Sequence, residues 1–406
     1  MTKARMTDSP AEAVTPAAYA ARVQTMATRL PEWIDRAEED RQLPPEFFAA
    51  CTQAGLFKVF QPRRWGGFEL PPLSFFDAIY ELSRVYPSAG WVYGVIGPHS
   101  WEVAALSHQA QADVWGEDPD AVISSSFAPM GKVIPVDGGY RLDGTWKYSS
   151  GSTGCSWVLV GGAVTRPGGP PDIRNFLLPL SDYAIVDTWQ TMGLKGTGSN
   201  DIVIRDAFVP DYRSNSLEDL YYGNNPGRRE NDGPLYKLPF MALFAPLLAY
   251  AAMGAAIGAH TLLTRYIADG AGTLNKGYDL AEEGHTHLRL ARAVSDIEAS
   301  RALLDALIGR MYAHALADEE IPLLLRKRIR FEASHAVERA YVAVMDIFRA
   351  AGTSVIAAGH PIQRHVLDVM TARTHIANNL DRIATFYGRE LLGIAGPPKG
   401  PGDFTT

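Results

Sequence analysis

The stretch AVISSSFAPMGKVIPVDGGYRLDGTWKYSSGSTGCSWVLVGG, residues 121–162, decides the fold, because the hydrophobic spacing changes here from helical to alternating. Its Asp137-Gly138-Gly139 segment predicts a hairpin turn, since Asp-Gly and Gly-Gly tolerate the positive φ of tight turns. Serines occupy the ends of two expected strands, at residues 124–126 and 149–150. Such hydroxyls add little to a core, but they offer hydrogen bonds and close backbone approach to a flat polar ligand. An ordinary hairpin with polar ends is the alternative.

The composition is that of an ordinary globular protein with room for more than one hydrophobic core. The chain has 406 residues, of which 47% are hydrophobic and 20% are charged. Its net charge of −7 argues against nucleic acid and anionic membranes as partners. Two cysteines, Cys51 and Cys155, cannot form a disulfide framework, and no signal-peptide pattern is present. We therefore expect a cytoplasmic protein.

The pattern divides the chain into three blocks. Helical patterns, several of them opened by proline, fill residues 1–120. Short strands between Gly, Pro and Asp clusters predict a compact antiparallel unit in residues 121–235, with 212–235 as a polar linker. Residues 236–395 predict four long helices, and 396–406 a tail. The expected strands are 121–127, 132–136, 140–149, 157–164, 175–180 and 202–208, and the expected bundle helices are 236–268, 285–317, 322–351 and 362–392. The fold class is thus α+β, mostly α, with an N-terminal helical domain, a central antiparallel β-barrel or sandwich and a C-terminal four-helix bundle.

One segment is long and apolar enough to be compared with a membrane span. Residues 240–259 carry no charge, but alanine and glycine dominate them, Pro246 interrupts them, and aromatic belts and basic flanks are missing. We therefore expect a buried central helix. Together with an apolar stripe in residues 290–311, this helix needs more partner surface than one bundle supplies, which predicts a homotetramer.

Few residue patterns point to chemistry without further context. Residues 192–200 alternate glycines and hydroxyls, as in a phosphate cradle or a wide turn, but lack the spacing of a P-loop or Rossmann fingerprint. Histidine pairs at 285–287 and 360–365 lack carboxylate or cysteine neighbours at ligand spacing, so no metal site is predicted. His375 lies on an expected helix, where a histidine is either a packed residue or a functional one.

Six motifs together resemble the monooxygenase branch of the acyl-CoA dehydrogenase fold. They are Gln61-Pro62 with Trp65-Gly66-Gly67, VWGEDP (114–119), SSSFAPM (124–130), YSSG (148–151), GLKGTGSN (193–200) and PIQR (361–364). This branch holds the oxygenase components of two-component flavin-dependent aromatic hydroxylases, including those that hydroxylate a phenolic secosteroid. The resemblance spans nearly the whole chain, and the combination is specific although no single motif is.

The resemblance implies a set of binding residues. Within one chain the flavin contacts would be Trp91, Ser125, Ser126, Phe127, Tyr148, Ser149 and Ser150. From a neighbouring subunit of the tetramer they would be Thr353, Ser354 and Ile376. His375 matches the family's catalytic histidine, Ser149 would donate beside the flavin N5 edge, and His99 is a weaker candidate for substrate contact. The branch has tyrosine where this chain has Phe127, its bundle arginine is shifted from Arg265, and residues 212–235 differ.

The resemblance also implies an activity. This is hydroxylation of an aromatic or phenolic substrate by O₂ and reduced FMN, or alternatively FADH₂, through a C4a-hydroperoxyflavin. A dry pocket with hydroxyl donors suits such an intermediate, and a histidine with a pKa near neutral suits removal of a phenol proton, an effect of about 10²–10⁴-fold. No nicotinamide fingerprint is present, which implies a separate NAD(P)H-dependent flavin reductase beside the small aromatic substrate.

Other interpretations stay open. An acyl-CoA dehydrogenase needs a glutamate base, whereas the matching segment reads His375-Ile376-Ala377-Asn378 and residues 240–259 contain no carboxylate. Oxidation of a nitrogen or sulfur centre would use the same flavin chemistry. A flavin-binding scaffold without catalysis is the alternative from another class.

Overall fold

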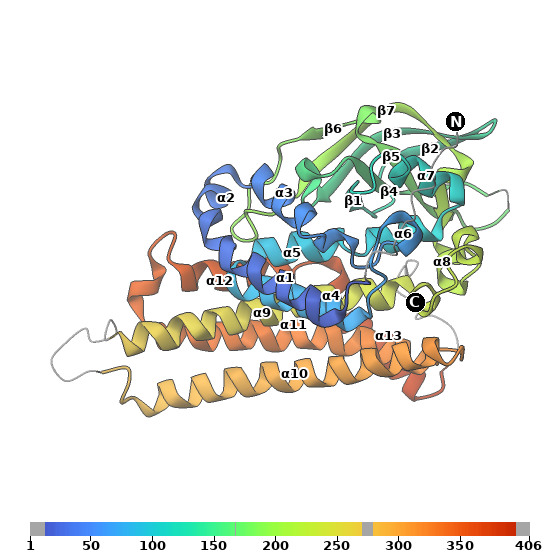
Figure 1. Ribbon diagram of the computed structural model, residues 1–406. Coiled ribbons are helices and arrows are strands. Elements are labelled where there is room, and N and C mark those ends of the chain that lie inside the picture. Colours follow the sequence, from blue (N-terminus) through green and yellow to red (C-terminus); the bar gives the residue numbers. More distant parts are fainter. Residues whose placement is uncertain (1–12, 167, 270–278, 395–406) are drawn as a thin grey trace, which may run out of the picture.

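The computed structural model describes residues 13–166, 168–269 and 279–394, so the expected tail at 396–406 lies outside the described residues. Two β-sheets occupy one side of the molecule and long helices the other, as Figure 1 shows. Helix α5 (Pro87–Ile96) contacts both strand β1 (Ile123–Ser126) and helix α9 (Phe240–Ala268), and helix α4 (Pro72–Val85) packs against α5 and α9, so α5 joins the sheets to the bundle. The order along the chain is α, then β, then α, as predicted from the sequence.

Seven helices precede the sheets, and proline begins several of them. Proline suits the first turn because its missing N–H has no partner there and its φ is already helical. The first helices are separated by a 3₁₀ turn at Leu30–Glu32, which has Pro31 as its second residue. The remaining helices of this block are α1 (Pro16–Arg29), α2 (Ile34–Asp40), α3 (Pro45–Gln53), α6 (His99–Ala105) and α7 (His108–Trp115).

Two four-stranded sheets form the central block. The first has the order β1-β4-β5-β8 and the second the order β2-β3-β7-β6. The pairing of β1 with β4 is parallel, so the prediction of an entirely antiparallel unit is wrong at this one pair. Every other pairing of these strands is antiparallel. The strands are β1 (Ile123–Ser126), β2 (Lys132–Val136), β3 (Gly139–Ser149), β4 (Trp157–Val164), β5 (Asp172–Pro179), β6 (Tyr183–Val186), β7 (Asn200–Pro210) and β8 (Ser214–Ser216).

The two sheets face each other across one apolar interior, which makes the block a sandwich. Leu142 and Trp146 from β3 pack with Val158, Phe176 and other side chains of the opposite sheet. Trp146 Nε1 donates to the carbonyl oxygen of Gly161 at 2.6 Å, so its one polar atom is satisfied inside the core. The hairpin between β2 and β3 turns at Asp137-Gly138, as predicted, and Gly138 has φ +73°.

The segment expected as a polar linker, residues 212–235, is instead an ordered part of the fold. It contains the edge strand β8 and helix α8 (Leu217–Tyr222). Its last residues are fixed to α6, because Trp101 Nε1 donates to the carbonyl oxygen of Leu235 at 2.9 Å and Asn231 Nδ2 to that of Ala104 at 2.8 Å. The prediction of a linker was therefore wrong here.

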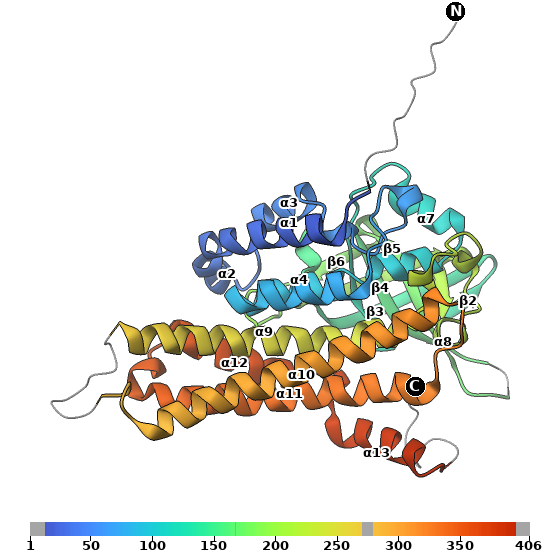
Figure 2. The same ribbon diagram turned by 60° about the horizontal axis from the view of Figure 1, so that its bottom comes forward.

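Helix α9 (Phe240–Ala268) is the centre of the C-terminal half. It packs against α4, α11 (Leu323–Ala351) and α12 (Pro361–Arg373), and Figure 2 shows α10 (Gly284–Leu316) running along the same bundle. Among the described residues it is the one helix long and apolar enough to span a membrane, yet 89% of its most apolar window is buried inside this chain. The expected buried helix is confirmed. One chain already covers it, however, so it gives no reason for a tetramer.

The fourth bundle helix, predicted over residues 362–392, is broken. Helix α12 ends at Arg373, a 3₁₀ turn covers Ile376–Asn378, and α13 (Leu380–Leu391) then packs against the first half of α11. Side chains stabilise the break. Asn378 Nδ2 donates to the carbonyl oxygen of Ala372 at 2.9 Å, and the Asn379 side chain accepts from the backbone N–H of Arg382 at 3.1 Å, which caps α13. His375 consequently lies in the break and not on a continuous helix.

Candidate functional site

A cluster of hydroxyl groups lies where β3 ends. Ser150 Oγ accepts from Trp91 Nε1 at 3.2 Å and shares a hydrogen bond with Ser199 Oγ at 2.7 Å. Ser199 Oγ in turn lies 2.7 Å from Thr197 Oγ1, so a chain of hydroxyls joins α5 to the glycine-rich segment before β7. We call Ser149, Ser150, Thr197 and Ser199 the hydroxyl corner.

Ser149 has the most informative position in the hydroxyl corner. Its side chain is fully buried, and its Oγ has no hydrogen-bond partner among the described residues. A buried hydroxyl without a partner costs about 1–3 kcal/mol, which indicates a site for a ligand's polar atom. The preceding Tyr148 has φ +68°, an uncommon value for a residue with a side chain, and its ring is 66% exposed beside Trp189.

The serines of β1 lie near the same strand end. Ser126 Oγ donates to the carbonyl oxygen of Lys147 on β3 at 2.6 Å, and this bond links the two sheets. Ser125 is half-buried and next to it. Phe127 follows directly and its ring contacts those of Phe240 and Phe244 on α9, at centroid distances of 5.8 and 5.5 Å. The end of β1 therefore connects the serines with an aromatic cluster at the start of α9.

His375 contacts the other side of Trp91. The two rings meet edge to face at a centroid distance of 5.8 Å. His375 Nδ1 accepts from the backbone N–H of Ala377 at 3.1 Å. Because a backbone N–H can only donate, Nδ1 carries no proton, and the proton of the neutral ring is on Nε2.

The electrostatic state of His375 differs from the sequence expectation. Its ring is half-buried in the isolated chain, but the groups around it exclude enough water that desolvation, followed by repulsion from the Arg330 guanidinium, lowers its pKa to about 4. The expectation of a pKa near neutral is wrong for this chain. At neutral pH His375 is uncharged, and its free nitrogen Nε2 is a hydrogen-bond donor.

His99 lies beside Phe127, the residue that follows the serines of β1. It is fully buried at the start of α6, and its ring meets that of Phe127 edge to face at 5.5 Å. Its Nε2 is buried and has no hydrogen-bond partner among the described residues. Phe127 therefore lies between His99 and the phenylalanines of α9.

The glycines of residues 193–198 serve packing. A Cβ on Gly193 would lie 2.2 Å from the carbonyl oxygen of Leu367, and one on Gly196 would lie 2.0 Å from the hydroxyl of Tyr86. The chain itself fills the space that a phosphate would need at these two positions. Of the two interpretations, the wide turn is the one that the structure favours. Asp368 on α12 holds this turn by accepting from the backbone N–H of Leu194.

The residues expected from a neighbouring subunit are not joined to the hydroxyl corner within one chain. Thr353 begins the 3₁₀ turn Thr353–Ile356 that follows α11, and this turn packs against α11 and α12 of the bundle. Thr353 is exposed, and Ile376, beside His375, is 80% exposed. The side chain of Ser354 lies outside what the structure describes. Arg265, the shifted arginine, is exposed in the last turn of α9.

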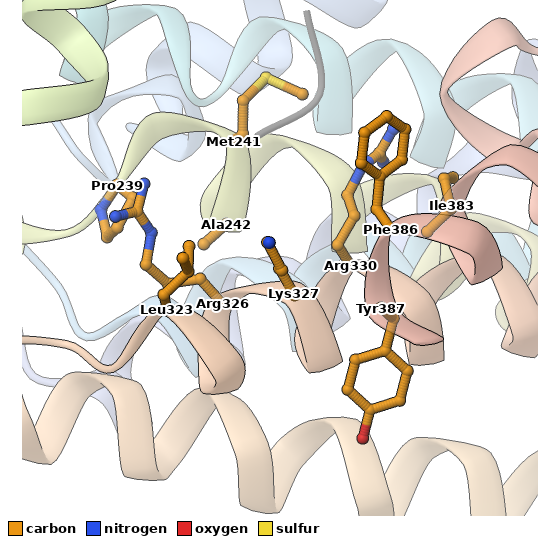
Figure 3. Close-up of a pocket in the computed structure, with 10 residues that line it drawn as sticks. All are labelled: Pro239, Met241, Ala242, Leu323, Arg326, Lys327, Arg330, Ile383, Phe386 and Tyr387. Carbon is orange, nitrogen blue, oxygen red and sulfur yellow. The ribbon is translucent and has the colours of Figure 1, made fainter. Parts of the chain in front are cut away.

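A small cavity of about 30 Å³, open to solvent, lies between α9, α11 and α13 (Figure 3). Met241 on its wall follows Phe240, which packs against Phe127, and Arg330 is the cation that lowers the pKa of His375. The residues that line the cavity are Pro239, Met241, Ala242, Leu323, Arg326, Lys327, Arg330, Ile383, Phe386 and Tyr387.

Sequence reasoning missed Thr197 and Ser199 as members of the site, although it singled out their segment. The signal was present in the hydroxyls between the glycines, but their partner Ser150 is 49 residues from Ser199. Within the described ranges, no three His, Cys, Asp or Glu side chains lie close enough to hold a metal ion.

Comparison with known proteins identifies the family of this chain and several relatives. Residues 18–116 match the family "Acyl-CoA dehydrogenase, N-terminal domain", and residues 247–380 match "Acyl-CoA dehydrogenase, C-terminal domain". The chain is 36% identical over 375 residues to the flavin-dependent monooxygenase oxygenase subunit HsaA of Rhodococcus jostii, covering 92% of this chain and 98% of that protein. It is 34% identical over 385 residues to the oxygenase component of an FADH(2)-dependent resorcinol hydroxylase from a Rhizobium species, covering 90% of this chain and 91% of that protein. The crystal structure of a 3-HSA hydroxylase from a Rhodococcus species superimposes with a TM-score of 0.88 at 35% identity, over 95% of this chain and 97% of that one.

Proposed function

Because this chain belongs to the oxygenase subunits of flavin-dependent monooxygenases with the acyl-CoA dehydrogenase fold, we propose that it hydroxylates a phenolic substrate with O₂ and reduced flavin. The name of the related resorcinol hydroxylase supports a phenol, and it supports FADH₂ ahead of reduced FMN. Relatives called oxygenase subunit or component support a separate NAD(P)H-dependent flavin reductase as partner. Because NAD(P)H is present in the cytoplasm, a reductase that uses it supports a cytoplasmic location for this chain.

The hydroxyl corner fits the polar edge of a flavin. The unpartnered Oγ of Ser149 would bond to the ring edge, and Ser150, fixed by Trp91 and Ser199, would hold the backbone beside it. The aromatic faces of Trp91 and Tyr148 suit a flat ring system. When bound, reduced flavin activates O₂ and supplies one oxygen atom to the substrate.

His375 would act at this site as a donor. Its Nδ1 is used by the N–H of Ala377, and its pKa near 4 keeps the ring neutral, so Nε2–H is available at neutral pH. A preoriented donor in a dry site contributes about 10²–10³-fold to rate. This assignment replaces the base that the sequence suggested.

His99 would take the phenol proton. Its buried Nε2 lacks a partner, and the rings of Phe127, Phe240 and Phe244 form an apolar cluster of the kind that holds an aromatic substrate. Removing the proton converts a poor nucleophile into a good one, because the negative charge increases electron density on the ring that receives oxygen.

The oligomer belongs to the same proposal. Ile376, itself an expected flavin contact, is 80% exposed, and Ile356, two residues after Ser354, is 57% exposed; such exposed apolar side chains favour a protein contact. A homotetramer would bring Thr353 and Ile376 of one subunit to the hydroxyl corner of another.

The observation that carries the proposal is that Trp91 contacts both Ser150 and His375, with the unpartnered hydroxyl of Ser149 on the residue before Ser150. The test supplies the purified chain with FADH₂ or FMNH₂ from a separate reductase, and with a panel of phenols, amines and thioethers. We expect a hydroxylated phenol with little hydrogen peroxide. Oxygen transfer only to amines or thioethers, or NADH oxidation by the chain alone, would contradict the proposal.

The role of His375 has a matched pair of variants. His375→Gln keeps a side-chain N–H donor and a carbonyl that can accept from the N–H of Ala377, whereas His375→Ala keeps neither. We expect the alanine variant to lose product by about 10²-fold and to release hydrogen peroxide, and the glutamine variant to keep most of the yield. Equal loss in both variants would mean that a base, and not a donor, is needed at this position.

A further inference from the structure

We infer that Glu102 and Asn175 are positioning residues that prepare His99 to accept a proton through Nε2. The inference rests on the proposed function, in which His99 receives the phenol proton. Glu102 Oε2 lies 2.9 Å from His99 Nδ1, and Asn175 Nδ2 donates to Glu102 Oε1 at 2.9 Å. His99, Glu102 and Asn175 are 0%, 3% and 2% exposed, so the whole row is buried.

The row assigns the tautomer of His99. The side-chain amide of Asn175 donates to one oxygen of Glu102, which leaves the other oxygen to accept from the imidazole. A carboxylate at Nδ1 keeps the proton of the neutral ring on that nitrogen. Nε2 then carries the lone pair, and this is the nitrogen that is buried without a partner. His99 is therefore the reverse of His375, whose Nδ1 accepts and whose Nε2 donates.

The chain geometry explains how the row is formed. His99 and Glu102 are three residues apart on α6, so their side chains lie on one face of the helix. Asn175 comes from β5 of the first sheet and fixes the carboxylate from the other side. On the remaining side, β1 and α9 present the rings of Phe127 and its neighbours. The groups that act on the Glu102 carboxyl are His99 and Asn175, besides its own burial.

Burying the Glu102 carboxylate costs folding free energy. A functional role therefore explains its presence better than a stabilising one. Burial raises the pKa of Glu102, and the hydrogen bonds from His99 and Asn175 oppose that rise. Buried ion pairs of this type are often no more stabilising than apolar side chains of similar volume. A carboxylate is, however, the group that stabilises an imidazolium when the ring gains a proton.

The proton transfer balances without any further reactant. The O–H bond of the phenol breaks, its electron pair stays on the phenolate oxygen, and the proton forms an N–H bond with Nε2 of His99. The resulting imidazolium has both nitrogens protonated and pairs with the Glu102 carboxylate through Nδ1–H. The substrate is thereby ionised before oxygen transfer.

The first test measures this ionisation in the absence of flavin. 4-Nitrophenol is a suitable probe because its phenolate, and not its neutral form, absorbs strongly in the visible range. It is titrated with the full chain at a pH below its own pKa. We expect the wild type to increase the ionised fraction of the bound probe, Glu102→Gln to abolish most of that increase, and Asn175→Ala to reduce it. His99→Asn defines complete loss.

The second test measures product per flavin oxidised with a separate reductase present. Glu102→Gln should lower hydroxylation of an ordinary phenol by about 10- to 100-fold, the scale for removing the partner that orients a functional imidazole. A fluorinated phenol that is already ionised at the assay pH should lose little, because it needs no base. The matched control is Asp305→Asn, which removes a half-buried carboxyl bonded to Tyr250 far along α10. It should leave both readouts unchanged.

The outcomes separate the two proposals. A wild type that hydroxylates phenols while Glu102→Gln and Asn175→Ala ionise the probe normally would overturn the positioning role alone. A wild type that leaves the bound probe neutral would overturn proton transfer to His99 and the positioning role with it. If Glu102→Gln does not fold, Asn175→Ala decides, because it removes the donor to the carboxylate and leaves the carboxylate in place. Equal loss for the ordinary and the ionised phenol would show a merely structural effect.

Discussion

Replacing Asp368 by asparagine should change how the stability of the protein depends on pH. Asp368 is 2% exposed on α12, and it accepts from the backbone N–H of Leu194 in the glycine-rich turn. It thus joins the sheet block to the bundle near the hydroxyl corner. Asparagine has the same shape and keeps an acceptor for Leu194, so the substitution removes the titration with little change in packing.

The size of the pH effect on the free energy of unfolding follows from the pKa of the Asp368 carboxyl. Burial, and then the nearby Glu38 carboxylate, raise the pKa of Asp368 from 3.8 to about 8, against the opposing effects of Leu194, Arg364 and Lys195. The folded state therefore holds the proton more tightly than the unfolded state. The stabilisation is fully present below about pH 4 and is lost as the pH rises through 8. The slope is at most about 1.4 kcal/mol per pH unit, and the total at most about 6 kcal/mol.

The assay is urea denaturation of wild type and Asp368→Asn at pH 5, 6, 7 and 8, followed by circular dichroism. We expect the free energy of unfolding of the variant, relative to that of the wild type, to increase from pH 5 to pH 8 by about 4 kcal/mol, within the total bound of about 6 kcal/mol. Asp269→Asn, at an exposed position after α9, is the control and should follow the wild type. Parallel curves for Asp368→Asn and wild type would refute the reasoning, because they would show that the carboxyl titrates alike in both states.

Three further predictions concern the flavin site and the oligomer. Ser150→Ala leaves the buried Trp91 Nε1 without its acceptor, so we expect a loss of about 1–3 kcal/mol in stability and weaker flavin binding in an anaerobic titration. Gly151→Ala should cost about 1–3 kcal/mol by thermal denaturation, because φ is +69° and the new Cβ would lie 2.7 Å from Val92 Cγ1. Ile376→Asp should dissociate the proposed tetramer in sedimentation experiments; an unchanged oligomer would exclude this surface as the interface.

Local chemistry made much of the fold predictable from the sequence. The bounds of β2 and β4 agree with the expected 132–136 and 157–164, because glycine, proline and aspartate mark their ends whatever they pack against. The hairpin turn depends only on Asp137-Gly138 and its neighbours. The apolar length of α9 was likewise sufficient to predict a buried helix, since no polar face was available for solvent.

The short edge strands could not be predicted in this way. Ser214–Ser216 is polar throughout, and β8 exists because its backbone pairs with Arg174–Phe176 of β5. The Ser216 hydroxyl also donates to Asp172 at 2.9 Å, which satisfies a polar side chain at the sheet edge. Its strand conformation is therefore a consequence of its partner, and no property of the three residues alone indicates it.

The chemistry of His375 could not be predicted for a related reason. A histidine on a continuous helix would leave its ring nitrogens free, and a pKa near neutral would then be a fair expectation. The break at residues 374–379 places the N–H of Ala377 beside Nδ1 and puts the ring against Trp91, a residue of α5. The first contact sets the tautomer, and burial with Arg330 nearby lowers the pKa. One missed feature, the end of α12 at Arg373, therefore accounts both for the error in the fold and for the error in the expected pKa of His375.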